Sequence, residues 1–127
     1  MQPTILIIED NEQNLYLTRF ILEQSGYKTR EARDGPTGIV LAQESQLALI
    51  LLDIQLPEMD GYTVARNLRS ISLLDTVPIV AVTSYAMVGD REQVLASGCD
   101  GYIEKPINPD TFISEIETYL NRPRGPS

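Results

Sequence analysis

Short apolar runs recur along the chain and alternate with segments of mixed character. The runs at residues 4–8, 47–52 and 78–82 are apolar throughout or nearly so, which is typical of strands buried on both faces. Residues 27–32 form a more polar run, and residues 101–104 form a short one, so both suit the edges of a sheet. The pattern therefore predicts three interior strands and two edge strands.

Helices are predicted in the segments that separate these runs. The first spans Asn11 to Ser25, and Gly26 follows where a helix end favours a residue without a Cβ atom. Its approximately helical apolar stripe comprises Leu15, Leu17, Phe20, Ile21 and Leu22. Asp34 and Asp60 are expected to cap the second and third helices, because a carboxylate accepts hydrogen bonds from unpaired backbone N–H groups.

Two further helices complete the pattern. The fourth spans about residues 89–97 and stops at Gly98. The fifth begins at Asn108 and Pro109, an N-cap followed by proline at the first helical position. Its apolar face comprises Phe112, Ile113, Ile116, Tyr119 and Leu120.

The alternation of strand and helix defines an α/β fold with five βα units. Right-handed crossovers and polar edge strands favour a doubly wound, five-stranded parallel sheet of order 2-1-3-4-5, the flavodoxin-like (βα)5 arrangement. The length of 127 residues suits one domain. We assign residues 1–121 to this domain and residues 122–127 to a flexible C-terminal tail.

Composition narrows the class of protein. The net charge of −8 disfavours direct binding to nucleic acid, which requires neutralised phosphates. The longest apolar runs are far shorter than the ~20 residues that cross a membrane, and residues 1–4 lack the features of a signal peptide, so we expect a cytoplasmic protein. The absence of histidine and the single cysteine exclude Ser-His-Asp catalysis, an internal disulfide and zinc held by histidine.

Three acidic residues follow neighbouring strands of the predicted sheet. Glu9 and Asp10 come directly after the first strand, and Asp53 comes directly after the third. Adjacent strands lie about 4.8 Å apart, so these side chains should converge. Two unit charges ~4 Å apart repel by ~4 kcal/mol at an effective dielectric of ~20, and a divalent cation resolves that repulsion. Hard carboxylate oxygens suit Mg²⁺; the alternative is that each acid caps a helix or faces solvent.

Thr83 and Lys105 end the fourth and fifth strands and fall on the same rim. A hydroxyl and an ammonium beside a metal-bound carboxylate can donate to the oxygens of a transferred phosphoryl group. Threonine is also a common strand residue, and a lysine at a strand end is often only solvated. Their shared position with the acids is what makes this pair informative.

The constellation Glu9-Asp10, Asp53, Thr83 and Lys105-Pro106 resembles that of response-regulator receiver domains of the CheY-like superfamily. The resemblance extends from Thr4 to Leu120, and its opening residues are similar to single-domain regulators of the DivK type and to receivers of hybrid histidine kinases. The segments that carry it are 51–61 (LLDIQLPEMDG), 82–86 (VTSYA) and 102–106 (YIEKP).

The resemblance implies a role for each residue of the rim. Asp53 is the phosphoacceptor, and Mg²⁺ is held by Glu9, Asp10, the Asp53 carboxylate and the backbone carbonyl of Gln55. Lys105 pairs with a phosphoryl oxygen, and Thr83 binds the same group and moves toward it. Tyr102 is the switch aromatic, which turns inward with Thr83. Structural roles fall to Pro57, Gly61 and Pro106: the first two shape the loop after Asp53, and the third forms a cis peptide bond with Lys105.

As a receiver, the protein is expected to act in two-component signal transduction as a switch rather than as an enzyme, with self-catalysed phosphotransfer and autodephosphorylation. The implied phosphodonor is a histidine kinase or a histidine phosphotransfer protein. A downstream protein target is expected on the face formed by the fourth helix, fifth strand and fifth helix. The chain should be a monomer or a weak, phosphorylation-dependent dimer.

Alternatives stay open at this point. The length of the chain favours a stand-alone regulator; the alternative is a receiver cut from a larger hybrid kinase or multidomain regulator, which would carry the same motifs. A Mg²⁺-dependent phosphatase would typically place a second acid where this chain has Gln55, and a flavodoxin-like carrier would need a phosphate-binding loop where Glu9 and Asp10 stand. An inactive receiver would not need the complete set of acids. Ser84 stands where the family often has alanine, and Gln55 and Tyr85 stand where it tunes phosphate lifetime.

Overall fold

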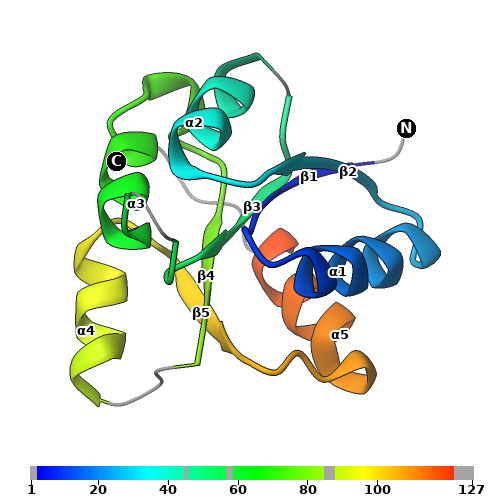
Figure 1. The fold of residues 1–127 in the computed structure, drawn as a ribbon. Coiled ribbons are helices and arrows are strands. Elements are labelled where there is room, and N and C mark those ends of the chain that lie inside the picture. Colours follow the sequence, from blue (N-terminus) through cyan, green and yellow to red (C-terminus); the bar gives the residue numbers. More distant parts are fainter. Residues whose placement is uncertain (1–2, 45, 57–58, 85–87, 122–127) are drawn as a thin grey trace.

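The computed structural model describes residues 3–44, 46–56, 59–84 and 88–121 and contains one parallel sheet (Figure 1). Its strands are β1 (Thr4–Ile8), β2 (Lys28–Ala32), β3 (Leu49–Asp53), β4 (Ile79–Thr83) and β5 (Gly101–Glu104). All neighbouring strands pair in parallel, and the order is β2-β1-β3-β4-β5. The predicted doubly wound sheet, with its polar second strand at one edge, is confirmed.

The helices are α1 (Glu12–Gln24), α2 (Gly35–Glu44), α3 (Gly61–Arg69), α4 (Val88–Ala96) and α5 (Pro109–Leu120). The predicted caps are present: Asn11, Asp34, Asp60 and Asn108 each accept a hydrogen bond from a backbone N–H of the helix that follows. A short 3-10 helix, η1 (Ser72–Leu74), was not predicted from the sequence. Its three residues are too few to carry a periodic signal.

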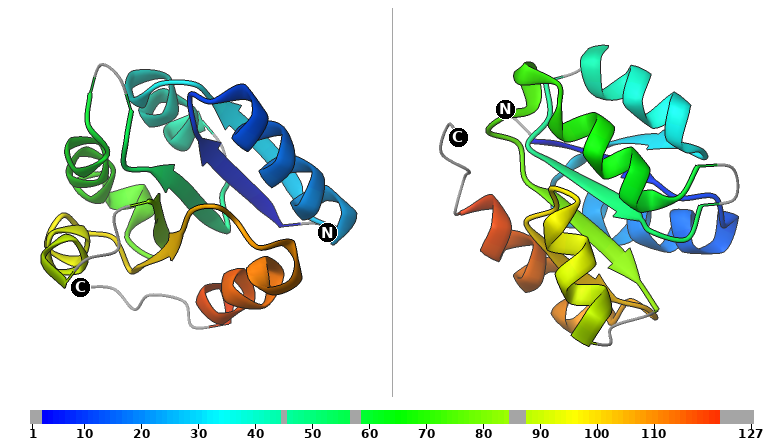
Figure 2. Two further views of the ribbon diagram at one scale, coloured as in Figure 1. Left: turned by 60° about the horizontal axis from the view of Figure 1, so that its bottom comes forward. Right: turned by 90° about the vertical axis from the view of Figure 1, so that its left-hand side faces the viewer.

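Alternate residues of each interior strand point to opposite faces of the sheet and pack into two separate cores, one on each face. Figures 1 and 2 show α1 and α5 on one face and α2, α3 and α4 on the other. The core under α1 and α5 is built on Ile5, Ile7, Leu49, Leu51, Val80 and Val82. The core under the other three helices is built on Leu6, Ile8, Ile50, Leu52, Ile79 and Ala81. Burial on both faces explains why these strands are apolar throughout.

The predicted apolar stripe of α1 is wrong in part. Leu17 is 37% exposed and Phe20 is 50% exposed, although Leu15, Ile21 and Leu22 are buried as expected. At about 100° per residue, Leu17 and Phe20 lie on the far side of the helix from Leu15. The buried face instead takes in the polar residue Thr18.

Some predictions fall outside the described residues, namely those for Pro57, Tyr85 and the tail at 122–127. Within the described ranges, no helix has both the length and the apolar character needed to cross a membrane.

Candidate functional site

The carboxyl ends of β1 and β3 lie side by side and bring together the acids that the sequence analysis singled out. One carboxylate oxygen from each of Glu9, Asp10 and Asp53 lies within 4.8 Å of the others. Glu9 is 5% exposed and Asp53 is 3% exposed, whereas Asp10 faces solvent. Three hard oxygen donors at this spacing, one of them open to water, match the ligand chemistry of a magnesium ion.

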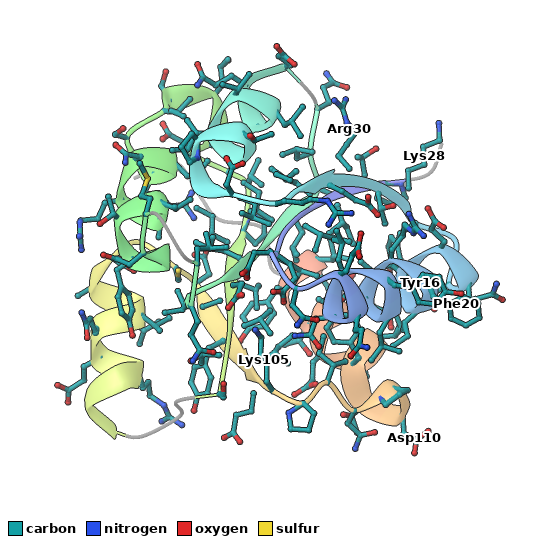
Figure 3. All side chains as sticks on the ribbon, in the orientation of Figure 1. Tyr16, Phe20, Lys28, Arg30, Lys105 and Asp110 are labelled. Atoms are coloured by element: carbon teal, nitrogen blue, oxygen red, sulfur yellow. The ribbon has the colours of Figure 1, made fainter. Side chains whose placement is uncertain are left out.

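Lys105 directly follows β5, and its side chain extends into this cluster. Its Nζ lies 3.0 Å from Oδ1 of Asp53 and 3.4 Å from Oε1 of Glu9, and its side chain is only 16% exposed. Figure 3 shows Lys105 well away from the exposed Lys28 and Arg30 of β2. The ammonium therefore pairs with two buried carboxylates rather than with water.

Backbone groups also hold the two buried carboxylates in place. The N–H of Gln55 donates to Oδ1 of Asp53 at 2.9 Å, and the N–H of Asn11 donates to Oε2 of Glu9 at 3.2 Å. Both donors come from the turns after the strands. Each carboxylate is thus oriented by the backbone N–H two residues further along the chain.

The surroundings of Glu9 in this cluster change its pKa. Burial raises the pKa of Glu9 from 4.5 to about 7, and a hydrogen bond to Asp53 and the charge of Asp53 add to this effect. The Asn11 N–H and the charge of Lys105 act in the opposite direction. Even with the Lys105 ammonium beside it, Glu9 is therefore easier to protonate than an exposed glutamate.

Thr83 is the last residue of β4 and is 2% exposed. Its carbonyl oxygen accepts a hydrogen bond from the backbone N–H of Lys105 at 2.9 Å, so the ends of β4 and β5 are joined at the rim. Val82 aligns with Asp53 in the register of β3 and β4. The predicted hydroxyl and ammonium residues therefore leave the same end of the sheet as the acids.

Gly61 opens α3 directly against the strand that carries Asp53. Its N–H donates to the carbonyl oxygen of Ile54 at 3.0 Å. A Cβ atom on Gly61 would lie 2.8 Å from the carbonyl oxygen of Asp53 and closer still to Cα of Ile54. Only glycine fits this close approach of two backbones.

Tyr102 lies half-buried in β5 and is held by α4, a contact that sequence analysis missed. The Tyr102 hydroxyl accepts hydrogen bonds from Nη2 of Arg91 at 2.8 Å and from Nε of Arg91 at 3.2 Å. The Arg91 guanidinium also lies 5.4 Å from the centre of the Tyr102 ring. No local pattern connects two residues on separate elements, so the sequence carried no signal for this pair.

A second missed contact crosses the rim. The Ser84 hydroxyl donates to Oε1 of Gln55 at 2.8 Å and joins the turns after β4 and β3. The peptide bond between Lys105 and Pro106 is cis, as the family resemblance implied.

A doubly wound parallel sheet with an acidic cluster, a partly buried lysine and a threonine at its carboxyl rim defines a class of signalling domain. The chain belongs to the family of response regulator receiver domains. The sequence pattern of that family matches residues 5–117. It is 44% identical over 120 residues to the polar-differentiation response regulator DivK of Brucella anthropi, a match that covers 94% of this chain and 98% of DivK.

Two solved structures add to this likeness. One is the receiver domain of a sensor histidine kinase from Pseudomonas aeruginosa PAO1, with a magnesium ion coordinated in its active site cleft. It is 30% identical, has a TM-score of 0.87, and the match covers 95% of this chain and 99% of that one. The other is the receiver of the Saccharomyces cerevisiae response regulator Ssk1, crystallised with the phosphotransfer protein Ypd1. It is 27% identical with a TM-score of 0.87, over 94% of this chain and 90% of that one.

Membership of this family places the protein in two-component signal transduction, as a signalling switch rather than a turnover enzyme. The family relationship and the fold were both predicted from the sequence, and both are confirmed.

Proposed function

We propose that Asp53 accepts a phosphoryl group from the phosphohistidine of a histidine kinase or a histidine phosphotransfer protein. The observation that carries the proposal is the ion pair of 3.0 Å between Asp53 Oδ1 and Lys105 Nζ, inside a cluster of three carboxylates. A buried aspartate with a cation and two further acids beside it has the composition of a phosphoryl-transfer site.

In the transfer step, an oxygen of the Asp53 carboxylate attacks phosphorus. The nitrogen–phosphorus bond of the donor breaks, its electron pair stays on the imidazole, and an aspartyl phosphate forms. The backbone N–H of Gln55, which donates to Asp53 Oδ1, keeps the carboxylate oriented during this attack. Autodephosphorylation is the attack of water on the same phosphorus, which returns the free carboxylate and inorganic phosphate.

Glu9, Asp10, Asp53 and the backbone carbonyl of Gln55 would hold Mg²⁺, and the ion supplies neutralising charge for the transferring group. Lys105 then exchanges its carboxylate partners for a phosphoryl oxygen. Phosphorylation replaces the single negative charge of the Asp53 carboxylate by a phosphoryl group of about −1.5 to −2 charge with three acceptor oxygens, so a lysine already pointing into the cluster gains a stronger partner.

The chemical event is relayed through Thr83 and Tyr102 to α4, β5 and α5, where a downstream protein binds. Thr83 moves toward the phosphoryl group, and Tyr102 leaves its half-buried position and turns inward. The contact between Tyr102 and Arg91 supports this route because it connects the switch aromatic to α4. The chain acts as a monomer or a weak, phosphorylation-dependent dimer.

The solved complex of Ypd1 with the Ssk1 receiver supports the choice of phosphodonor. A receiver with the same fold binds a histidine phosphotransfer protein there, and the matched region covers 94% of this chain. The absence of histidine from the chain means that the phosphohistidine must come from the partner.

The test is phosphoryl incorporation by the Asp53→Asn variant. The wild type, incubated with Mg²⁺ and a radiolabelled acyl phosphate donor, should gain label that hydroxylamine releases, as an acyl phosphate requires. Asp53→Asn should gain none, because an amide is a poor nucleophile toward phosphorus. Asp110→Asn, which removes one exposed carboxylate at the start of α5, is the matched control and should be labelled like the wild type. Normal labelling of Asp53→Asn would overturn the assignment.

A further inference from the structure

An open groove of about 970 Å³ lies at the amino-terminal ends of the strands. It is lined by residues that begin or precede β1, β3 and β4, together with residues of β2, α2 and η1. Asp53 ends β3, so the groove and the acidic rim lie at opposite ends of the same strands. Because each interior strand has five residues with a rise of about 3.3 Å per residue, the two are separate surfaces.

Two cations line this groove from one side of β2. Lys28 and Arg30 are both exposed, and both belong to the lining. Alternate residues of a strand share a face, and Ala32, two residues further on, packs in the core under α2, α3 and α4. The two cations therefore extend from β2 on the side where α2 lies (Figure 3). Glu44 is the one acid among the described lining residues, so the lining is positively charged although the chain carries −8.

The part of the groove away from β2 is apolar. Leu73 of η1 lines it and is 77% exposed, and no other large apolar side chain in the described ranges is as exposed. Leu47 and Val77 line the same groove and are partly or almost wholly buried. A single exposed leucine is common on protein surfaces, but this one shares a groove with two cations. The groove therefore offers positive charge at one end and apolar surface at the other.

The strand order sets the distance between the two ends. From β2 to β4 the sheet has three strand spacings of about 4.8 Å, so the groove extends about 14 Å from the cations to the residues before β4. There η1 is held beside β4 by a hydrogen bond of 3.0 Å from the Val77 N–H to the carbonyl oxygen of Leu74. An extended chain covers about 3.3 Å per residue, so about four or five residues span the groove.

We propose that the groove binds an extended, acidic segment of a partner protein, with its carboxylates on Lys28 and Arg30 and an apolar side chain on Leu73. The charge of the partner follows from complementarity: two cations attract an acidic segment, and the remaining surface of a chain of charge −8 repels it. Apolar contact with Leu73 removes exposed surface from water and adds affinity that charge alone does not supply. A segment of this kind carries neighbouring acids followed, about four or five residues later, by an apolar residue.

This surface is separate from the proposed phosphoryl chemistry. It contains none of the rim residues, and the inference stands whether or not Asp53 is phosphorylated. It also lies apart from the face of α4, β5 and α5, where a downstream target is expected, because no described lining residue comes from those elements. The groove therefore gives the receiver a second contact surface for a partner.

The test follows the backbone amide resonances of the isotope-labelled protein during titration with a synthetic peptide. The probe is acetyl-Glu-Glu-Thr-Ser-Thr-Leu-amide, which separates an acidic pair from a leucine by the length of the groove. Saturable shifts should occur at 28–30, 47–48 and 73–77 and should be absent at the rim. Two control peptides, one with lysine in place of both glutamates and one with serine in place of leucine, should bind at least about fivefold more weakly.

Two variants test the two ends of the groove. Lys28→Glu should weaken peptide binding by about three- to tenfold, because it replaces an attractive charge by a repulsive one. Leu73→Ser should weaken it by about fivefold or more, because the apolar contact is lost. Arg66→Glu and Leu95→Ser, which change exposed side chains of α3 and α4, are the matched controls and should bind like the wild type. All four side chains are exposed, so urea midpoints and the labelling of Asp53 should stay close to those of the wild type.

The proposal is wrong if the peptide causes no saturable shifts, if the shifts lie outside the groove, or if both variants bind as the wild type does. Equal binding of the peptide that lacks leucine would also contradict it, since charge alone would then explain the contact. Groove resonances that move with protein concentration in the absence of peptide would assign the groove to a second copy of the chain instead. Should one variant fail to fold, the other must still weaken binding. Failure of Asp53 labelling in the wild type would refute the proposed function and leave this inference unaffected.

Discussion

At the scale of single residues, the position of Asp53 depends on a glycine in another element. Gly61 lets the start of α3 pack directly on the backbone of Asp53 and Ile54, where no side chain has room. Gly26, after α1, is glycine for a different reason: its φ of 95° lies in the left-handed region, yet a Cβ atom there would meet nothing within 4 Å. Variants of the two glycines therefore distinguish the effect of a steric clash, at Gly61, from the effect of a strained backbone conformation, at Gly26.

Gly61→Ala should lower the free energy of unfolding by about 1–3 kcal/mol, since the added methyl group forces two backbones apart. It should also reduce phosphoryl incorporation, because the displaced backbone carries Asp53. Gly26→Ala should lower stability but leave incorporation unchanged. Urea denaturation and labelling of both variants provide the measurement. A Gly61→Ala protein with normal stability and normal labelling would show that the contact has no such role.

The sequence predicted the carboxylate cluster because position along a strand is enough to place such residues. Glu9, Asp10 and Asp53 lie at or just after the ends of buried strands, and neighbouring parallel strands all end at one edge of the sheet. The bond between Ser84 and Gln55 could not be predicted in this way. It depends on side-chain rotamers in two turns, and neither residue type implies the other.

At the scale of elements, helix boundaries followed from local chemistry, whereas the buried face of α1 did not. Asn11 and Asn108 cap helices through contacts two or three residues away, which a sequence can indicate. The face of α1 that is buried depends on how the helix lies on the sheet. Tyr16 and Phe20 instead stack on each other, with ring centres 6.3 Å apart, on the outer side of α1 (Figure 3).

Long-range polar contacts between elements could not be predicted from the sequence either. Arg69, at the end of α3, donates to the carbonyl oxygens of Leu74, Val77 and Gly98 and pairs with Asp100 at 3.0 Å. These contacts join α3, the segment before β4 and the turn before β5. An arginine in the last turn of a helix predicts only a favourable interaction with the helix dipole.

The contact between Arg91 and Tyr102 gives a prediction about the coupling of α4 to β5. Because Arg91 holds Tyr102 half-buried, its removal should favour the inward conformation that accompanies phosphorylation. Arg91→Ala should therefore bind beryllium trifluoride, a phosphoryl analogue, about two- to fivefold more tightly in the presence of Mg²⁺. Arg66→Ala, which removes an exposed arginine of α3, is the control for lost charge. Unchanged or weaker binding of the analogue by Arg91→Ala would count against this role.

At the scale of the whole molecule, the order of the strands is what assembles the site. Because β1, β3, β4 and β5 are consecutive in the sheet, Glu9, Asp53, Thr83 and Lys105 leave one rim from four neighbouring strands. The two cores, one on each face of the sheet, hold the strands rigidly. The acids at the strand ends therefore cannot move apart to relieve their mutual repulsion. Burial first, and then the hydrogen bond to Asp53 and the charge of Asp53, raise the pKa of Glu9 in this fixed position.

This order was predictable because two independent signals agreed. Apolar runs identified the interior strands, and the polar residues of β2 identified an edge, which left few topologies once crossovers were taken as right-handed. The ion pairs among the side chains at the rim were harder to predict from the sequence. The pairing of Lys105 with both Asp53 and Glu9 emerges only when all the strand ends are in place.

The central claim is that the acids at this rim bind Mg²⁺ beside Asp53, and calorimetric titration with Mg²⁺ tests it most directly. The wild type should show saturable binding at one site. Asp10→Asn, chosen because Asp10 is exposed and its loss should not disturb the fold, should bind about tenfold more weakly or worse. Asp110→Asn should bind like the wild type. A wild type that shows no saturable binding, or an Asp10→Asn variant with unchanged affinity, would contradict the account.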